Sequence, residues 1–299
     1  MFFKTCLQDL PGKPEYKFVN FRDVNPLSGT DKFRNLGLSN KAMTILQKRL
    51  LQYVRNLPVK LPQATAFRKK CSIDKNVKKH RNRRYLYIFD IAKAFPSVNI
   101  EKLAQIICQI DPGLFGQEKL VSHFLSSYCQ HPNGGLVIGA NASPALFNLY
   151  AGILIDSPLS SLCQKYSLLY SRYSDDLIFS AKSHPIGRGK RRAIRQVVIK
   201  AGFSIQHSKA KVIDLNKGPV VINGIGIKRN GDLYIPRSYL RKIRGLIHLA
   251  RENPDLRPMV HGLMGNFWTF TSTTSFNQTE KKLIQAYRQL QKLEKDQRL

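Results

Sequence analysis

The chain has 299 residues, with 49 Lys and Arg against 19 Asp and Glu and a formal net charge of +30. Such an excess of positive charge repels itself, and counterion release from a polyanion would relieve it, so the composition predicts a nucleic acid partner. Hydrophobic residues make up 42% of the chain, enough for a large core, but the longest apolar stretch, 145–155, is interrupted by Asn148. We expect that stretch to be too short to cross a bilayer.

The cysteines and the first residues bear on metal chemistry and location. The five cysteines are far apart and have no metal-ligand spacing, which predicts free, mostly buried thiols and argues against zinc. The start, Met1-Phe2-Phe3-Lys4, lacks the pattern of a secretory signal. We therefore expect a cytoplasmic protein.

The predicted elements follow in chain order. Apolar residues in 42–53 recur at spacings of three and four, which predicts a helix with Ser39 as its N-cap. Residues 85–89 read as a buried strand, 99–108 and 142–155 as helices, 168–181 as two strands joined by a turn, and 203–213 as a strand. After Gly231 the pattern is helical and basic. This order predicts an α+β fold with no internal repeat.

Carboxylates stand at the ends of two predicted strands. Asp175 and Asp176 lie at the bend of 168–181, and Asp90 ends the strand 85–89. Acids at a bend are also common turn residues on protein surfaces. If the two strands are sheet neighbours, however, the three carboxylates gather around a pair of Mg²⁺ ions, the arrangement of two-metal phosphoryl transfer. Nucleotide addition and phosphodiester cleavage both fit.

Several ordered motifs resemble those of the bacterial retron-type reverse transcriptases, from about Arg34 to the end of the chain. Residues 89–97, FDIAKAFPS, resemble the first palm motif, and Tyr173-Ser174-Asp175-Asp176 resembles the second metal motif, with Ser174 where Ala is usual. The resemblance implies that Asp90, Ile91, Asp175 and Asp176 hold the metals. It also implies that Phe95 gates the sugar of the incoming nucleotide.

Further motifs imply contacts with the nucleotide. Gly139 begins a segment, GANASP, that resembles the one under the template and the incoming nucleotide, although Ile138 replaces a common Gln. Lys209 follows a palm-like GFSI and is implied to act at the leaving pyrophosphate, with Lys211 as its rival. Arg34 opens a fingers-like motif and is implied to hold the triphosphate. That motif continues through Leu36, Ser39, Met43 and Gln47, and weaker candidates, Lys17 and Arg22, precede it.

Two segments resemble elements of retron enzymes in particular. Residues 76–80 resemble the NAxxH element, with Val77 for Ala, and 222–224 resemble the VTG element. The resemblance implies RNA contacts here, and the basic helical pattern after Gly231 adds phosphate contacts. The expected RNA-binding residues are Asn76, His80, Asn223, Gly224, Arg237, Arg241, Lys242 and Arg244.

As a whole, the resemblance implies a right-hand polymerase with an antiparallel palm sheet. Fingers would occupy 1–85, with 105–140 returning to them, the palm 86–228, and a helical thumb 229–299. The implied activity is RNA-dependent DNA synthesis with two Mg²⁺ ions, or Mn²⁺ in their place. The implied template and primer is a structured non-coding RNA with a priming 2′-hydroxyl, which would give an RNA–DNA hybrid product, and a separate effector protein would complete an antiphage system.

Other functions remain open from the sequence. A group II intron-like or a diversity-generating reverse transcriptase would share the palm motifs. A two-metal nuclease would use the same carboxylates but would leave Phe95, Gly139 and Lys209 without a role. A ribonucleoprotein scaffold or antitoxin would need the bound nucleic acid more than continued synthesis.

Overall fold

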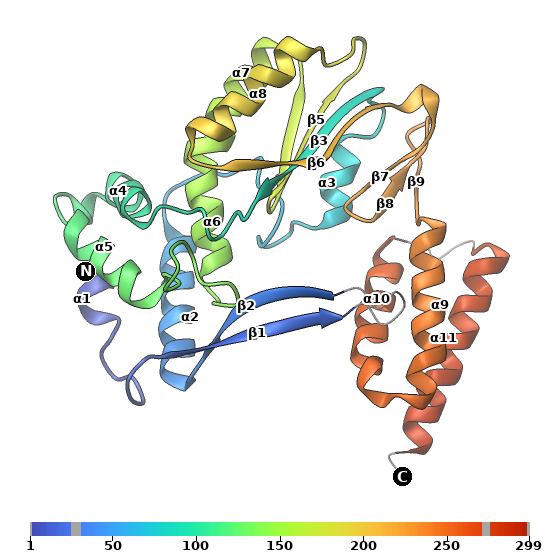
Figure 1. Ribbon diagram of the computed structural model, residues 1–299, viewed down its shortest axis with the longest axis horizontal. Helices are drawn as coiled ribbons and strands as arrows, with labels where there is room; N and C mark the ends of the chain where they lie inside the picture. Colours follow the sequence, from blue (N-terminus) through green and yellow to red (C-terminus); the bar gives the residue numbers. More distant parts are fainter. Residues whose placement is uncertain (1, 25–30, 271–275, 298–299) are drawn as a thin grey trace. The chain divides into compact units, whose positions relative to one another are not determined.

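The computed structural model describes residues 2–24, 31–270 and 276–297 (Figure 1). Its contacts divide the chain into two compact units. The first unit comprises Met1–Arg22, Phe33–Asn76 and Arg83–Asp214, and the second comprises Asp23–Lys32, Val77–Asn82 and Leu215–Leu299. Helices pack on antiparallel sheets, which confirms the predicted α+β class.

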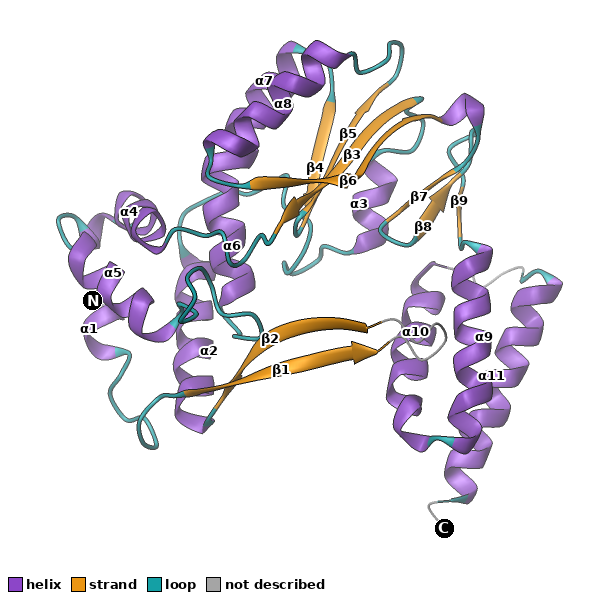
Figure 2. Ribbon diagram, viewed as in Figure 1, coloured by secondary structure: helices purple, strands orange, loops and turns teal. Residues whose placement is uncertain are grey.

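A four-stranded antiparallel sheet in the order β4-β5-β3-β6 forms the centre of the first unit (Figure 2). Its strands are β3 (Tyr85–Ala92), β4 (Leu169–Tyr173), β5 (Asp176–Ala181) and β6 (Ser204–Asp214). Aromatic side chains from three of the strands pack on one face: Phe89 stacks on Phe179 and Phe179 on Tyr170, with ring centroids 5.9 and 4.8 Å apart. The predicted strands are thus confirmed, and β3 extends two residues past Asp90.

The helices of the first unit supply the rest of its core. They are α1 (Phe2–Thr5), α2 (Lys41–Asn56), α4 (Ile100–Ile110), α5 (Glu118–Tyr128), α6 (Ser143–Ala151), α7 (Ser157–Lys165) and α8 (Arg188–Lys200), while α3 (Ile73–Lys79) continues into the second unit. The first unit also holds a 3₁₀ turn, Pro112–Leu114. A two-stranded sheet of β1 (Tyr16–Val24) and β2 (Asp31–Ser39) belongs to this unit up to Arg22 and from Phe33 on. Four of the five cysteines are buried and all five are free thiols.

One helical segment corrects an expectation. A π-helical turn, Gly152–Asp156, joins α6 to α7, so helix runs from Ser143 to Lys165. At 23 residues this helix is long and apolar enough to cross a membrane. Our expectation that the apolar stretch is too short to do so, which considered only 145–155, was therefore wrong. Most of its apolar window is buried inside the protein, however, which gives it the position of a core helix.

The second unit holds a small sheet and three helices. Its strands are β7 (Val220–Ile222), β8 (Ile225–Ile227) and β9 (Leu233–Tyr234), and its helices are α9 (Arg237–Glu252), α10 (Arg257–Phe270) and α11 (Gln278–Asp296), with 3₁₀ turns at Leu215–Lys217 and Pro254–Leu256. Leu240, Ile243 and Ile247 of α9 are buried against Met264 and Leu283 of the other two helices. The predicted basic helical region is therefore a three-helix core with a charged exterior.

The N-cap of α2 is Asn40 and not the expected Ser39. Strand β2 extends through Ser39, so the helix begins one residue later than the sequence suggested. The Asn40 side chain accepts from Met43 N at 2.8 Å and donates to Lys13 O at 2.8 Å. The cap therefore joins α2 to the segment before β1.

We predict that Asn40→Ala lowers the free energy of unfolding by about 1–2 kcal/mol, because both the helix cap and the bond to Lys13 are lost. Urea unfolding followed by circular dichroism measures this loss. Lys41→Ala, at the exposed first helical position, is the matched control and should change stability by less than about 0.5 kcal/mol. Equal effects of the two substitutions would show that Asn40 is not the cap.

Candidate active site

Three acidic residues lie where β3 and β5 pair. The antiparallel register places Asp90 directly opposite Asp176, so the two side chains project from the same face of the sheet. Ser174 and Asp175 form the turn between β4 and β5, and Ile91 N donates to Asp175 O at 2.9 Å. The structure thus brings together the three acids that the sequence predicted from distant segments.

Strand alternation separates these acids from the main core. Phe89 precedes Asp90 on β3, and Leu177 follows Asp176 on β5. These two residues are paired with each other in the register, and both are fully buried. Because successive side chains of a strand point to opposite faces, the carboxylates project from the other face. There the Asp90 side chain keeps 14% of its surface exposed. The carboxylates are therefore held by buried neighbours yet reach solvent.

Lys209 of β6 supplies positive charge at this point. Its ammonium forms an ion pair with the Asp90 carboxylate. The hydrogen bond to Asp90 raises the pKa of Lys209, the charges of Asp176 and Asp175 act in the same direction, and partial burial opposes them. The rival candidate, Lys211, instead stands opposite Ile88 in the register. Lys209 therefore occupies the field of all three carboxylates.

The donor chemistry fits a hard divalent cation. Like charges placed directly opposite in a sheet are destabilising, and Mg²⁺ binds carboxylate oxygens. In the described ranges, no three or more His, Cys, Asp and Glu side chains are placed together so that they could hold a metal ion as they stand. At Asp90 the Lys209 ammonium stands where a cation would bind. The Ile91 side chain is a buried hydrocarbon, so the main-chain carbonyl oxygen is the ligand atom that this residue could offer.

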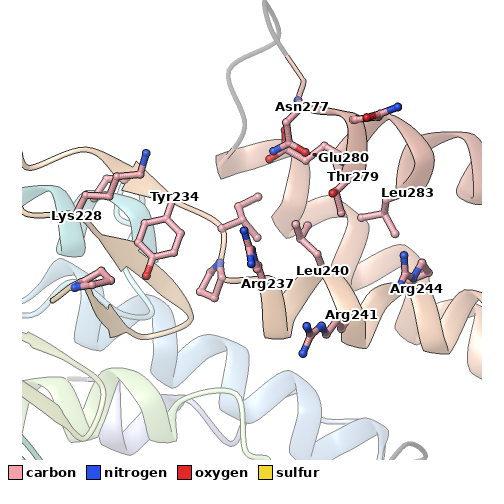
Figure 3. Close-up of a pocket in the computed structure, with 15 residues that line it drawn as sticks. Lys228, Tyr234, Arg237, Leu240, Arg241, Arg244, Asn277, Thr279, Glu280 and Leu283 are labelled. Atoms are coloured by element: carbon pink, nitrogen blue, oxygen red, sulfur yellow. Dashed lines mark hydrogen bonds between the residues drawn. The ribbon is translucent and has the colours of Figure 1, made fainter.

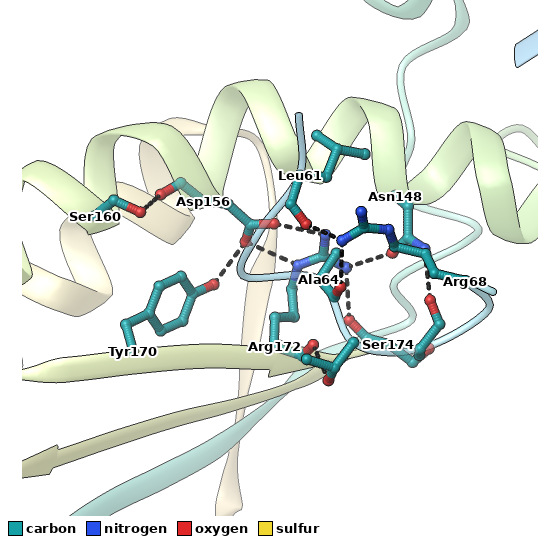
Figure 4. Close-up of polar contacts among 11 residues, drawn as sticks. Leu61, Ala64, Arg68, Asn148, Asp156, Ser160, Tyr170, Arg172 and Ser174 are labelled. Carbon is teal, nitrogen blue, oxygen red and sulfur yellow. Dashed lines mark hydrogen bonds and ion pairs between the residues drawn. The ribbon is translucent and has the colours of Figure 1, made fainter. Parts of the chain in front are cut away.

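A buried arginine, which the sequence analysis missed, fixes the turn from the opposite side (Figure 4). Arg172 of β4 is fully buried, and its Nε and Nη2 atoms donate to the two carboxylate oxygens of Asp156 at 2.9 and 2.8 Å. Its Nη1 atom donates to Asn148 Oδ1 and to Ser174 O, both at 3.0 Å. Ser174 has a φ of 58°, unusual for a residue other than glycine. Arg172 thus holds the strained residue that precedes Asp175.

Tyr170 completes the polar cluster around Asp156. Its hydroxyl donates to Asp156 Oδ1 at 2.7 Å. Burial and then the negative charge of Asp156 hold the pKa of Tyr170 well above its usual range, so the hydroxyl keeps its proton. Asp156 lies on the π-helical turn, the kind of helix irregularity that often occurs at functional sites.

The candidate nucleotide residues lie on two parts of the first unit. Arg34 is exposed on β2, and Gly37 of the same strand donates from its N to Ile138 O at 2.9 Å. Gly139 has a φ of +100°, and a Cβ there would lie 3.2 Å from Gly37 O, so the close approach requires glycine. These contacts join Arg34's strand to the Gly139 segment.

Phe95 is half-buried and stacks on Phe147 of α6, with the ring centroids 5.0 Å apart.

Gln47 has a structural role that its place in the fingers-like motif did not reveal. Its buried side chain donates to Tyr128 O at 2.7 Å and accepts from Ala142 N at 3.2 Å. It therefore links α2 to the end of α5 and to the segment that follows Gly139.

The expected RNA-binding residues fall into buried and exposed sets. Asn76 and His80 are fully buried, and Asn76 Oδ1 accepts from Ser171 Oγ at 2.6 Å. Their side chains thus shape the protein interior. Asn223 and Gly224 form the β7–β8 turn, with φ of 49° and 86°, as in a type I′ hairpin turn.

The arginines of α9 belong to the exposed set. Arg237, Arg241 and Arg244 are exposed at helical spacing, whereas Lys242 is half-buried. The three arginines line a cavity of about 1330 Å³ between the small sheet, α9 and the start of α11, which Tyr234 also lines (Figure 3). This surface combines positive charge with an aromatic ring.

The family follows from comparison with known sequences. A family model described as reverse transcriptase (RNA-dependent DNA polymerase) matches residues 22–227, which include the three carboxylates and Lys209. The chain belongs to the reverse transcriptase family.

Curated relatives include retron reverse transcriptases. The Mx65 enzyme of Myxococcus xanthus is 27% identical over 75% of this chain, and the Ec83 enzyme of Escherichia coli is 26% identical over 68%. The matches span 54% and 67% of those enzymes, so this chain covers only about half of the first. A solved telomerase from Candida albicans has a TM-score of 0.49 and 9% identity over 96% of this chain and 60% of its own, a likeness too low to support an argument.

We predict that Arg172→Ala lowers the free energy of unfolding by about 3–5 kcal/mol, because it leaves the Asp156 carboxylate buried without its partner. The double variant Arg172→Met/Asp156→Leu removes both charges and should lose much less than the sum of the two single substitutions. Urea unfolding of the four proteins gives the coupling. Additive losses would mean that the two side chains do not act as a pair.

Proposed function

We propose that this protein is an RNA-dependent DNA polymerase of the retron type, which copies a structured non-coding RNA into single-stranded DNA. The convergence of Asp90, Asp175 and Asp176 beside Lys209 carries this proposal. Membership of the reverse transcriptase family supports it, because the matched region contains all four residues.

Each residue of the site has a task in nucleotide addition. Asp90, Asp175, Asp176 and the Ile91 carbonyl would hold two Mg²⁺ ions, or Mn²⁺. Such ions lower the pKa of an attacking hydroxyl and stabilise charge on the phosphates. Lys209 has a side chain that is 63% exposed, and its ammonium would neutralise charge on the departing pyrophosphate. Arg34 holds the triphosphate, Gly139 allows close approach of the nucleotide, and Phe95 limits the space at the sugar.

The second unit is proposed to bind the RNA. Arg237, Arg241 and Arg244 present their guanidinium groups along one side of α9 (Figure 3), which suits contacts with successive phosphates. The formal net charge of +30 supports the same assignment. Lys242 adds charge beside this row, and the buried Asn76 and His80 support the surrounding structure.

The retron assignment carries further expectations. Similarity to the Mx65 and Ec83 retron reverse transcriptases supports the retron type. With that type we propose priming from a 2′-hydroxyl of the RNA, an RNA–DNA hybrid product and an antiphage role with a separate effector in the cytoplasm. A group II intron-like or diversity-generating enzyme is the alternative within the family. A scaffold or antitoxin role would leave the geometry of the carboxylates without a use.

Primer extension tests the proposed activity. With an RNA template, a DNA primer, dNTPs and Mg²⁺, the protein should extend the primer, and Asp90→Asn or Asp176→Asn should reduce extension by at least about 10³-fold, because each removes a metal-binding charge. Asp232→Asn, an exposed acid of the second unit, is the matched control and should extend normally. Release of fragments without extension would identify a nuclease instead.

A further inference from the structure

The loop between α2 and α3 displays an aromatic side chain in an unusual conformation. Phe67 is 49% exposed and has a φ of 58°. A positive φ is a genuine outlier for a bulky residue, and such strain persists only where the surrounding structure enforces it. A half-exposed phenylalanine ring gains little burial energy that could offset the backbone strain, so core packing does not explain why Phe67 stands at this position.

The residues immediately before Phe67 are tied to the catalytic part of the sheet. Thr65 N and Oγ1 donate to Arg172 O at 2.8 and 2.9 Å. Asn148 Nδ2 donates to Ala66 O at 2.9 Å, and Arg68 Nη1 donates to Ala64 O at 2.9 Å (Figure 4). Residues 64–66 are buried, whereas 67–70 are exposed. These hydrogen bonds of Thr65, Ala66 and Ala64, which we call the frame, hold the loop up to Phe67, and the Phe67 ring lies at the start of the exposed part.

A cavity of about 720 Å³ lies beside this ring, between the loop, α2 and α6. Its apolar wall includes Leu51 and Leu149, and its cationic side chains are Lys48, Arg55, Arg68 and Lys69. None of the described residues that line it is Asp or Glu. The volume is in the range of small-ligand sites. A fixed aromatic ring, an apolar wall and surrounding cations are what an unpaired nucleobase and its phosphates require.

We propose that Phe67 and this cavity bind an unpaired nucleotide of single-stranded RNA. The base stacks on the Phe67 ring, and Lys48, Arg55 and Lys69 contact the phosphates on either side of it. The frame fixes this site to the backbone of Arg172, whose guanidinium also holds Ser174 at the catalytic turn. The identification of this RNA as the template strand rests on the proposed polymerase function. The stacking site itself does not depend on that function.

The substitution Phe67→Gly distinguishes the effect of the backbone strain on stability from the effect of the aromatic ring on RNA binding. Glycine adopts positive φ freely, so the variant should unfold at a midpoint no lower than that of Lys70→Gly, which relaxes a φ of 61° in the same loop without removing a ring. Affinity for single-stranded RNA should fall about fivefold to a hundredfold, the effect of losing one base–aromatic stack. Phe67→Trp should keep the affinity. Phe115→Ala, which removes a phenylalanine that is 89% exposed in the same unit, should leave it unchanged.

The direct readout uses oligoribonucleotides with 2-aminopurine at successive positions, because stacking quenches its fluorescence. Quenching at one position with wild-type protein, lost in Phe67→Gly and retained in Lys70→Gly, supports the site. The proposal is overturned if Phe67→Gly binds and quenches like the wild type. It is also overturned if Phe67→Gly unfolds well below Lys70→Gly, because the ring would then be a structural element.

The two proposals fail in different ways. Wild-type protein that binds RNA and quenches 2-aminopurine but never extends a primer would remove the polymerase assignment and leave the stacking site. Primer extension by a Phe67→Gly variant that also binds RNA and quenches 2-aminopurine like the wild type would remove the stacking site and leave the polymerase.

Discussion

The pairing of β3 with β5 sets Asp90 opposite Asp176, and the site depends on how the protein tolerates these two like charges. Backbone hydrogen bonds of the sheet fix the separation of the two Cα atoms, so the two side chains remain neighbours on one face whichever rotamers they adopt. Compensation must come from cations brought to them. Lys209 provides one on the third strand, and its contact with Asp90 shows where positive charge is most stabilised.

A second cation lies on the opposite face of the same sheet. Arg172 neutralises Asp156 inside the helical layer and at the same time binds Ser174 O, one residue before Asp175. A buried ion pair of this kind adds little net stability, because desolvation of both charges offsets their attraction. Its contribution here is geometric: the Arg172 side chain binds the carbonyl of Ser174, which has a positive φ, and the Arg172 main-chain oxygen accepts from Thr65 in the loop that carries Phe67. Arg172 thus connects the catalytic turn to the proposed stacking site.

The sequence predicted the strands, the turn and the meeting of the three acids because each depends on local signals. An apolar run followed by acid marked β3, and an apolar run preceded by acid marked β5. Two strands buried by such runs tend to be neighbours. The Arg172–Asp156 pair had no such signal, since its members are separated in sequence. Asp156 also lies on a π-helical turn, which no residue pattern predicted. The N-cap of α2 was misplaced by one residue because the end of β2 depends on pairing with β1, which propensity does not encode.

Joint binding of a divalent cation by Asp90, Asp175 and Asp176 is the claim on which the proposed chemistry depends. Crystals soaked in Mn²⁺ and measured at its absorption edge test this claim without relying on activity. The account predicts an anomalous peak within coordination distance of carboxylate oxygens from both Asp90 and the Asp175–Asp176 turn, with Lys209 displaced from Asp90. A structure in which Mn²⁺ binds elsewhere, while Lys209 stays on Asp90, would contradict it.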